Sequence, residues 1–302
     1  MNLLNVSFSV FPKSTISLLV VLLFTTYSNS QFIQNEKGQF VKEELFFNPI
    51  VIKNKNIKSI KVSFLEKKQL KGIYQTDIKS NHFSFDNWGR IKRVYKTYRT
   101  DTTVEWRYYK DNKISAIKKG SNNVIKVKSI FYENDKPIIN IIATSINESQ
   151  DVTILKIKNY REESAEYINY KKLQNGDSLI EWSYTGKSIF KKLLISKKDS
   201  LTIKETYSFP LKSLNYHSYE YNYLNKLLSK LIVVNSSSYY YHFIYDSNQE
   251  LIKYSKFDSK LNSEIETCEL LYEKETGNLQ AIITKNKLNN SIKIRKFNYT
   301  YF

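Results

Sequence analysis

The feature that most constrains this chain is a recurring unit of two aromatic residues at positions i and i+2, four to six polar or turn-forming residues, and an aliphatic residue. In the first half, the anchor aromatics are spaced 21, 23 and 24 residues apart, at Phe64, Phe85, Tyr108 and Tyr132. The unit returns at Tyr221, Tyr245, Tyr272 and Tyr299. A fixed period of this size indicates a fold built by repeating one small supersecondary element.

Each unit is predicted to be a β-hairpin. The residues that approach an aromatic pair alternate between apolar and polar, as in Val104, Trp106 and Tyr108, which places the apolar side chains on one face of a strand. The intervening Asp, Asn and Gly residues favour tight turns. Since one hairpin cannot bury its own apolar face, the units must stack side by side. We therefore expect an all-β protein whose repeated antiparallel hairpins form a long coiled or shell-like sheet.

Three units resemble known repeat families. Phe85-Asp86-Asn-Trp-Gly89-Arg-Ile91 and Tyr245-Asp246-Ser-Asn-Gln-Glu-Leu251 resemble the tyrosine–aspartate (YD, or RHS-type) repeats of exported bacterial proteins. Tyr108-Tyr109-Lys-Asp-Asn112-Lys-Ile114 is similar to the hairpins of the MORN-like repeat family. The resemblance implies a curved or shell-like sheet that serves as a scaffold or binding surface, and it brings no catalytic residues with it.

The first thirty residues have the pattern of a secretory signal peptide, with an apolar stretch over 16–24 and small residues Ser28 and Ser30 before the expected cleavage site. We therefore predict export to the periplasm or the extracellular space, with no membrane-spanning segment in the mature chain. The remainder divides into a basic hairpin-repeat half, 31–138, and a near-neutral hairpin-repeat half, 139–302, whose repeats are degraded over about 139–210. One continuous domain over 31–302 fits the same pattern.

Positive charge is concentrated in the first half. Residues 51–130 carry 20 Lys and Arg against 6 Asp and Glu, whereas residues 131–302 carry 24 against 20. A concentrated positive field attracts polyanions, and aromatic side chains beside it can stack on sugar rings. The candidate binding residues, which we expect to share the solvent face, are Arg90, Lys92, Arg93, Lys96, Arg99 and Arg107, with Trp88 and Tyr109. Simple solvation of exposed strand faces by lysine accounts for the same pattern.

The sequence contains little that points to catalysis, a cofactor or a metal. A single cysteine, Cys268, and three scattered histidines provide no ligand set for zinc or an iron–sulfur cluster. Cys268 lies in an apolar strand and is predicted to be a core residue rather than the partner of His242. Carboxylates that could form a hydrolytic pair occur in two groups, which are Asp86, Asp101 and Glu105, and Glu264, Glu266 and Glu269.

We predict a non-enzymatic exported binding or scaffold protein at the cell envelope. Its partner would be an anionic polysaccharide, another envelope component or a protein, and nucleic acid is the least favoured ligand because export removes the chain from it. Two alternatives remain open. One is a periplasmic carrier whose sheet encloses a lipid or another hydrophobic ligand, and the other is a glycan hydrolase that uses a carboxylate pair.

Overall fold

The computed structural model describes residues 31–38, 40, 45–67, 74–99, 101–121, 124–147, 157–184, 188–209, 212–235 and 237–302. The predicted signal peptide, residues 1–30, lies outside this part of the chain. The described residues contain one short α-helix near the beginning and eighteen β-strands.

All eighteen strands belong to one antiparallel sheet in which each strand pairs with its neighbours in the sequence. The helix is α2 (Pro49–Asn54). The strands are β1 (Ile57–Lys67), β2 (Tyr74–Phe85), β3 (Ile91–Tyr98), β4 (Asp101–Lys110), β5 (Lys113–Gly120), β6 (Val124–Glu133), β7 (Lys136–Asn147), β8 (Ile157–Lys172), β9 (Ser178–Tyr184), β10 (Ser188–Lys198), β11 (Leu201–Phe209), β12 (Lys212–Tyr221), β13 (Leu227–Val234), β14 (Ser237–Tyr245), β15 (Leu251–Asp258), β16 (Ser263–Tyr272), β17 (Leu279–Asn286) and β18 (Ser291–Tyr301).

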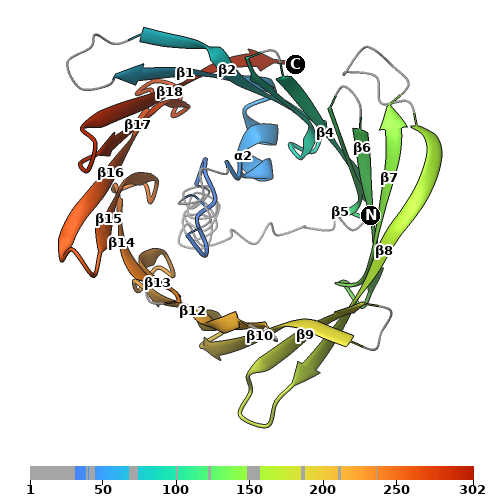
Figure 1. Ribbon diagram of the computed structural model, residues 1–302. Helices are drawn as coiled ribbons and strands as arrows, with labels where there is room; N and C mark the ends of the chain where they lie inside the picture. The colour runs from blue at the N-terminus through green and yellow to red at the C-terminus, as the bar shows by residue number, and fades with distance from the viewer. Residues whose placement is uncertain are drawn as a thin grey trace, which may run out of the picture.

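The sheet closes on itself into a barrel (Figure 1). β1 pairs with β2 on one side and with β18 on the other, in a register that joins Val62 to Phe297. The prediction of an all-β fold of antiparallel hairpins is confirmed, but the coiled or shell-like open sheet is wrong. The resemblance to YD or MORN-like repeats is also wrong, because closure by the β1–β18 ladder leaves no open end to which further repeats could be added.

A chain of tyrosine hydroxyl bonds explains the repeated unit. In six cases a tyrosine donates its hydroxyl hydrogen to the backbone carbonyl of a residue 18 to 21 positions earlier, near the start of an earlier strand, and in the seventh case the separation is 33 positions. Tyr245, for example, donates to Leu227 at 2.9 Å, and Tyr272 donates to Leu251 at 3.0 Å. The other members of this tyrosine ladder are Tyr109 to Ile91, Tyr132 to Ile114, Tyr170 to Pro137, Tyr221 to Thr202 and Tyr299 to Leu279.

The aspartates of the two best-matching units shape the hairpin turns. The carboxylate of Asp86 accepts hydrogen bonds from the backbone N–H groups of Trp88 and Arg90, and the carboxylate of Asp246 does the same for Asn248 and Glu250. These side-chain bonds add to the backbone bonds that close each turn, which run from the Asp86 N–H to the Arg90 carbonyl and from the Asp246 N–H to the Glu250 carbonyl. The local hairpin prediction therefore holds even though the family resemblance does not.

The described residues before β1, which are 31–38, 40 and 45–56, form an inner segment in the lumen of the barrel, where α2 is visible inside the ring of strands in Figure 1. A barrel of about eighteen strands is too wide for its own side chains to fill, and this segment supplies part of the missing core. Phe32, Ile33, Phe40 and Ile52 are almost fully buried there. They belong to one hydrophobic cluster with wall residues from β1–β3 and β12–β18. Among the side chains that the structure describes, none from β4 to β11 belongs to this cluster.

Candidate functional site

One buried carboxylate, that of Glu205, and one partly buried carboxylate, that of Glu250, hold the inner segment against the wall. Glu205 on β11 forms an ion pair of 2.7 Å with Lys37 and also accepts the hydroxyl hydrogens of Tyr207 and Tyr219, each at 2.8 Å. Burial alone would raise the pKa of Glu205, but the hydrogen bonds from Lys37 and the two tyrosines outweigh it and lower the pKa. The carboxylate is therefore ionised at neutral pH.

The second carboxylate, Glu250, immediately precedes β15 and contacts Phe32 of the inner segment. Both of its oxygens accept from the backbone N–H of Phe32, at 3.2 and 3.0 Å. Burial raises the pKa of Glu250 to about 7, and the repulsion of Asp246 adds to this, while Lys55 and Lys226 oppose it. The group thus changes its charge near neutral pH, in contact with Phe32 of the inner segment.

A cavity of about 710 Å³ lies where the inner segment leaves the lumen unfilled. Leu45 and Phe46 of the segment form one side, and β2 to β5 form the other. The lumen face of the wall follows from the register, because Phe83, Val94, Glu105 and Lys119 pair directly across four strands. Phe83 and Val94 belong to the internal hydrophobic cluster, so this whole row faces inward.

The cavity wall changes from apolar to cationic along the strands. On β3, Ile91 and Val94 lie nearest α2, and Lys96 and Tyr98 follow toward the other end of the strand. The four cations that line the cavity are Lys79, Lys96, Arg107 and Lys119, against the two acids Asp101 and Glu105. Glu105 is already paired with Arg107 at 2.8 Å, so the lysines are left to set the local field. Such a wall suits a ligand with an apolar part and an anionic group.

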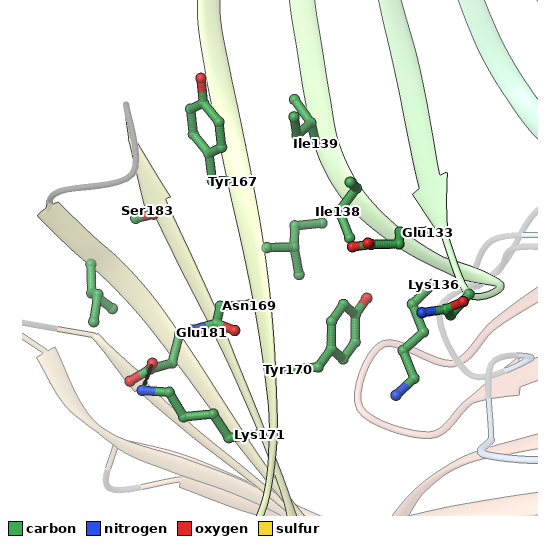
Figure 2. A pocket seen from close by; sticks show the side chains of 13 residues that line it. Glu133, Lys136, Ile138, Ile139, Tyr167, Asn169, Tyr170, Lys171, Glu181 and Ser183 are labelled. Atoms are coloured by element: carbon green, nitrogen blue, oxygen red, sulfur yellow. Dashed lines mark hydrogen bonds and ion pairs between the residues drawn. The ribbon is translucent and has the colours of Figure 1, made fainter.

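A second concavity, of about 720 Å³, lies over β6 to β10 and is shown in Figure 2. Glu181 is its central charged group, and it pairs with Lys171 at 2.7 Å and with Lys192 at 3.2 Å. The hydrogen bond from Lys171 lowers the pKa of Glu181 most, despite some burial. The Lys191 ammonium lies over the rings of both Trp182 and Tyr207, so Trp182 shares the lumen face with Tyr207. Glu181 is the neighbour of Trp182 in the sequence and therefore points to the opposite face. Glu181 and this concavity therefore lie on the outer face.

The predicted binding residues divide among several places instead of sharing one face. Lys96 and Arg107 line the lumen cavity, and Lys92 and Arg93 line a groove on the outside. Trp88 and Arg90 line the same outer groove and, together with Tyr109, a hollow beside α2. Arg99 lies in the turn after β3, over the ring of Tyr98. Arg90 pairs with Asp86 at 2.7 Å and lies 4.3 Å from the ring centre of Tyr109. Four of the eight residues, Trp88, Arg90, Lys92 and Arg93, therefore share the outer groove, whereas Lys96 and Arg107 point into the lumen.

Most of the candidate catalytic carboxylates are bound to other side chains. Asp101 and Glu105 line the same cavity with their Cα atoms about 13 Å apart along β4, and Glu105 is paired with Arg107, as Asp86 is with Arg90. Glu266 accepts the hydroxyl hydrogen of Tyr254 at 2.8 Å, while Glu264 and Glu269 pair with Lys287 and Lys285. Within the described ranges, no three His, Cys, Asp or Glu side chains are grouped as metal ligands would be.

Cys268 is a core residue, as the sequence predicted. Its side chain is fully buried, and burial raises the pKa of the thiol to about 11. His242 is exposed on the other face of the sheet. It is the cross-strand partner of Ser255, which in turn is the partner of Thr267. Thr267 immediately precedes Cys268, so the side chains of His242 and Cys268 point to opposite faces. The two side chains therefore cannot form a nucleophile and base pair.

Comparison with known proteins yields remote likenesses in fold alone. No family model matches the chain, and neither does any curated protein. A porin-like protein from Bacteroides uniformis is 6% identical with a TM-score of 0.39, over 82% of this chain and 97% of that chain. A porin-like protein from Bacteroides vulgatus is 11% identical with a TM-score of 0.36, over 81% and 98%. A LolA superfamily protein from Nitrosomonas europaea is 8% identical with a TM-score of 0.23, over 82% and 90%.

These similar structures are porin-like and LolA-superfamily proteins, not YD or MORN-like repeat proteins. All three TM-scores are below 0.5, so the function of this chain is inferred from its own geometry. Among the helices that the structure describes, none has the length and apolar character needed to cross a membrane.

Proposed function

We propose that this protein is an exported carrier that holds an amphipathic ligand with an anionic group in the lumen of its barrel. The observation that carries the proposal is the cavity of about 710 Å³ beside the inner segment, which is apolar next to the core and cationic farther along β2 to β4. Its volume lies within the range of known small-molecule sites, roughly 300–1,000 Å³. The apolar part of the ligand would contact Phe83, Ile91 and Val94, and its anionic group would meet Lys79 and Lys96.

The charged residues on the outer face favour a barrel that is surrounded by water. This face carries the ion pairs of Glu181 with Lys171 and Lys192, and that of Glu269 with Lys285. A barrel that faces lipid has an apolar outer band, in which such charges are costly. Together with the predicted signal peptide, this supports a carrier in the periplasm or outside the cell.

Binding of dodecanoate and of uncharged dodecanol, measured by isothermal titration calorimetry, tests the proposal. Thr103→Trp should lower the affinity for both ligands by at least tenfold, because Thr103 lines the cavity and an indole would occupy it. Lys96→Gln should weaken dodecanoate by about three- to fivefold and leave dodecanol unchanged, since a partly solvated ion pair is worth at most about 1 kcal/mol.

Lys92→Gln is the matched control, because it removes the same charge from the same strand but from the outer groove, where the register shift between β2 and β3 interrupts the alternation at Lys92. It should change neither affinity. If the wild-type chain binds neither ligand, or if Lys92→Gln weakens dodecanoate as much as Lys96→Gln does, the lumen cavity is not the binding site.

A further inference from the structure

A row of directly paired side chains crosses the outside of the barrel. The register runs from β18 through β1, β2, β3 and β4 to β5, each residue being the direct partner of the next. The members of this outer row are Thr300, Ser59, Ser84, Arg93, Trp106 and Lys118. With adjacent strands about 4.8 Å apart, the five steps span about 24 Å.

The outer row lies on the face opposite the lumen cavity. Arg93 immediately precedes Val94, whose side chain is buried in the internal cluster, and successive side chains on a strand point to opposite faces. Five of the six members, all except Lys118, line a groove of about 680 Å³. The outer row is therefore part of a hollow in the barrel surface.

The chemistry of the groove changes along its length. At one end, the Ser59 hydroxyl is 2.8 Å from that of Thr300 and 3.0 Å from Nε2 of His82. At the other end, the Arg93 guanidinium lies 5.2 Å from the ring centre of Trp106. Hydroxyl groups and an indole face are the usual partners of a sugar ring, and a guanidinium is the usual partner of a carboxylate, sulfate or phosphate.

The charge of the groove has one sign. Lys58, Lys92 and Arg93 line it, and the acid among its lining residues, Asp86, is already paired with Arg90. Burial lowers the pKa of His82, and the nearby Arg93 and Lys61 lower it further, which agrees with a positive potential at this position. A concave surface with a single sign of charge concentrates oppositely charged ligands.

We propose that the outer row binds an acidic polysaccharide, with the sugar chain lying across β18 and β1–β5. The extended shape favours a polymer over a single anion, because a chain can engage hydroxyl, guanidinium and indole groups at several successive positions. Contacts that are weak one by one gain affinity when they are linked along one ligand. This site is separate from the lumen cavity and does not depend on the carrier function.

Fluorescence titration with polygalacturonate and dextran sulfate, with neutral dextran as the polymer control, tests this proposal at low salt. The double variant Arg93→Gln with Trp106→Ala should bind both acidic polymers at least tenfold more weakly than the wild type. Its remaining affinity should depend less on the salt concentration. Lys96→Gln is the matched control, because it removes one positive charge from β3 on the lumen face. It should change the polymer affinity by less than twofold.

Arg93→Lys keeps the charge but not the planar donor group, so an intermediate loss is expected. Thermal unfolding of every variant establishes that each is folded. The proposal is overturned if the wild type binds neither acidic polymer, if neutral dextran binds equally well, or if Lys96→Gln weakens binding as much as the double variant does. Binding to vesicles of anionic lipid without binding to either polymer would assign the row to a membrane surface and would also overturn it.

Discussion

Removal of one hydroxyl group from the tyrosine ladder, by Tyr245→Phe, should destabilise the barrel measurably. The Tyr245 hydroxyl donates to the carbonyl of Leu227 at 2.9 Å, and Leu227 is only 1% exposed. Burial also raises the pKa of this phenol to about 12. Losing a hydrogen bond to a buried acceptor costs about 1–3 kcal/mol, while the ring of phenylalanine preserves the packing.

Equilibrium unfolding in urea, followed by tryptophan fluorescence and far-UV circular dichroism, measures this cost. The midpoint should fall without a change in the slope, because the surface exposed on unfolding stays the same. Tyr223→Phe is the matched control, since Tyr223 is 92% exposed, and it should change stability by less than about 0.5 kcal/mol. If the two variants are equally stable, the ladder does not stabilise the barrel.

Two further predictions concern the inner segment. Gly89→Ala should cost at least about 1 kcal/mol more than Gly176→Ala in the same urea assay. Both glycines have a positive φ, but a Cβ at Gly89 would lie 2.0 Å from the Pro49 carbonyl oxygen of α2, whereas one at Gly176 would meet nothing within 4 Å. Equal losses would show that α2 does not pack closely there. Stability should also fall as the pH rises from about 5 to 7, because Glu250, with a pKa of about 7, keeps a proton that the unfolded chain has released. Glu250→Gln should flatten the dependence of stability on pH. Both chains should keep residues before Gln31, so that no new α-ammonium group lies beside the carboxylate. An unchanged slope would show that Glu250 is not the source of the pH dependence.

The hairpins could be predicted from the sequence because their signals are local. Asp86 and Asp246 form their turns within four residues, and the alternation around Trp106 is visible in a single strand. Closure of the barrel had no such signal. It depends on the pairing of β1 with β18, which joins segments about 240 residues apart, and on a strand number that sets the width of the lumen.

The inner helix was also missed, although its beginning carries a recognisable signal. Asn48 accepts a hydrogen bond from the backbone N–H of Ile50 as an N-cap, and Pro49 follows it in the first turn. With six residues, α2 is too short to show the 3.6-residue period used to find helices.

The division of the basic residues between two faces follows from parity along β3. Arg93 and Lys96 are three positions apart, so on a regular strand they must point to opposite sides, and the structure places one in the outer groove and the other in the lumen cavity. This makes the two proposals separable by reciprocal variants of one strand. Loss of dodecanoate binding should follow Lys96→Gln alone, and loss of polymer binding should follow the Arg93 variant alone. If each variant weakened both ligands equally, the total charge of the barrel, and not either site, would account for binding.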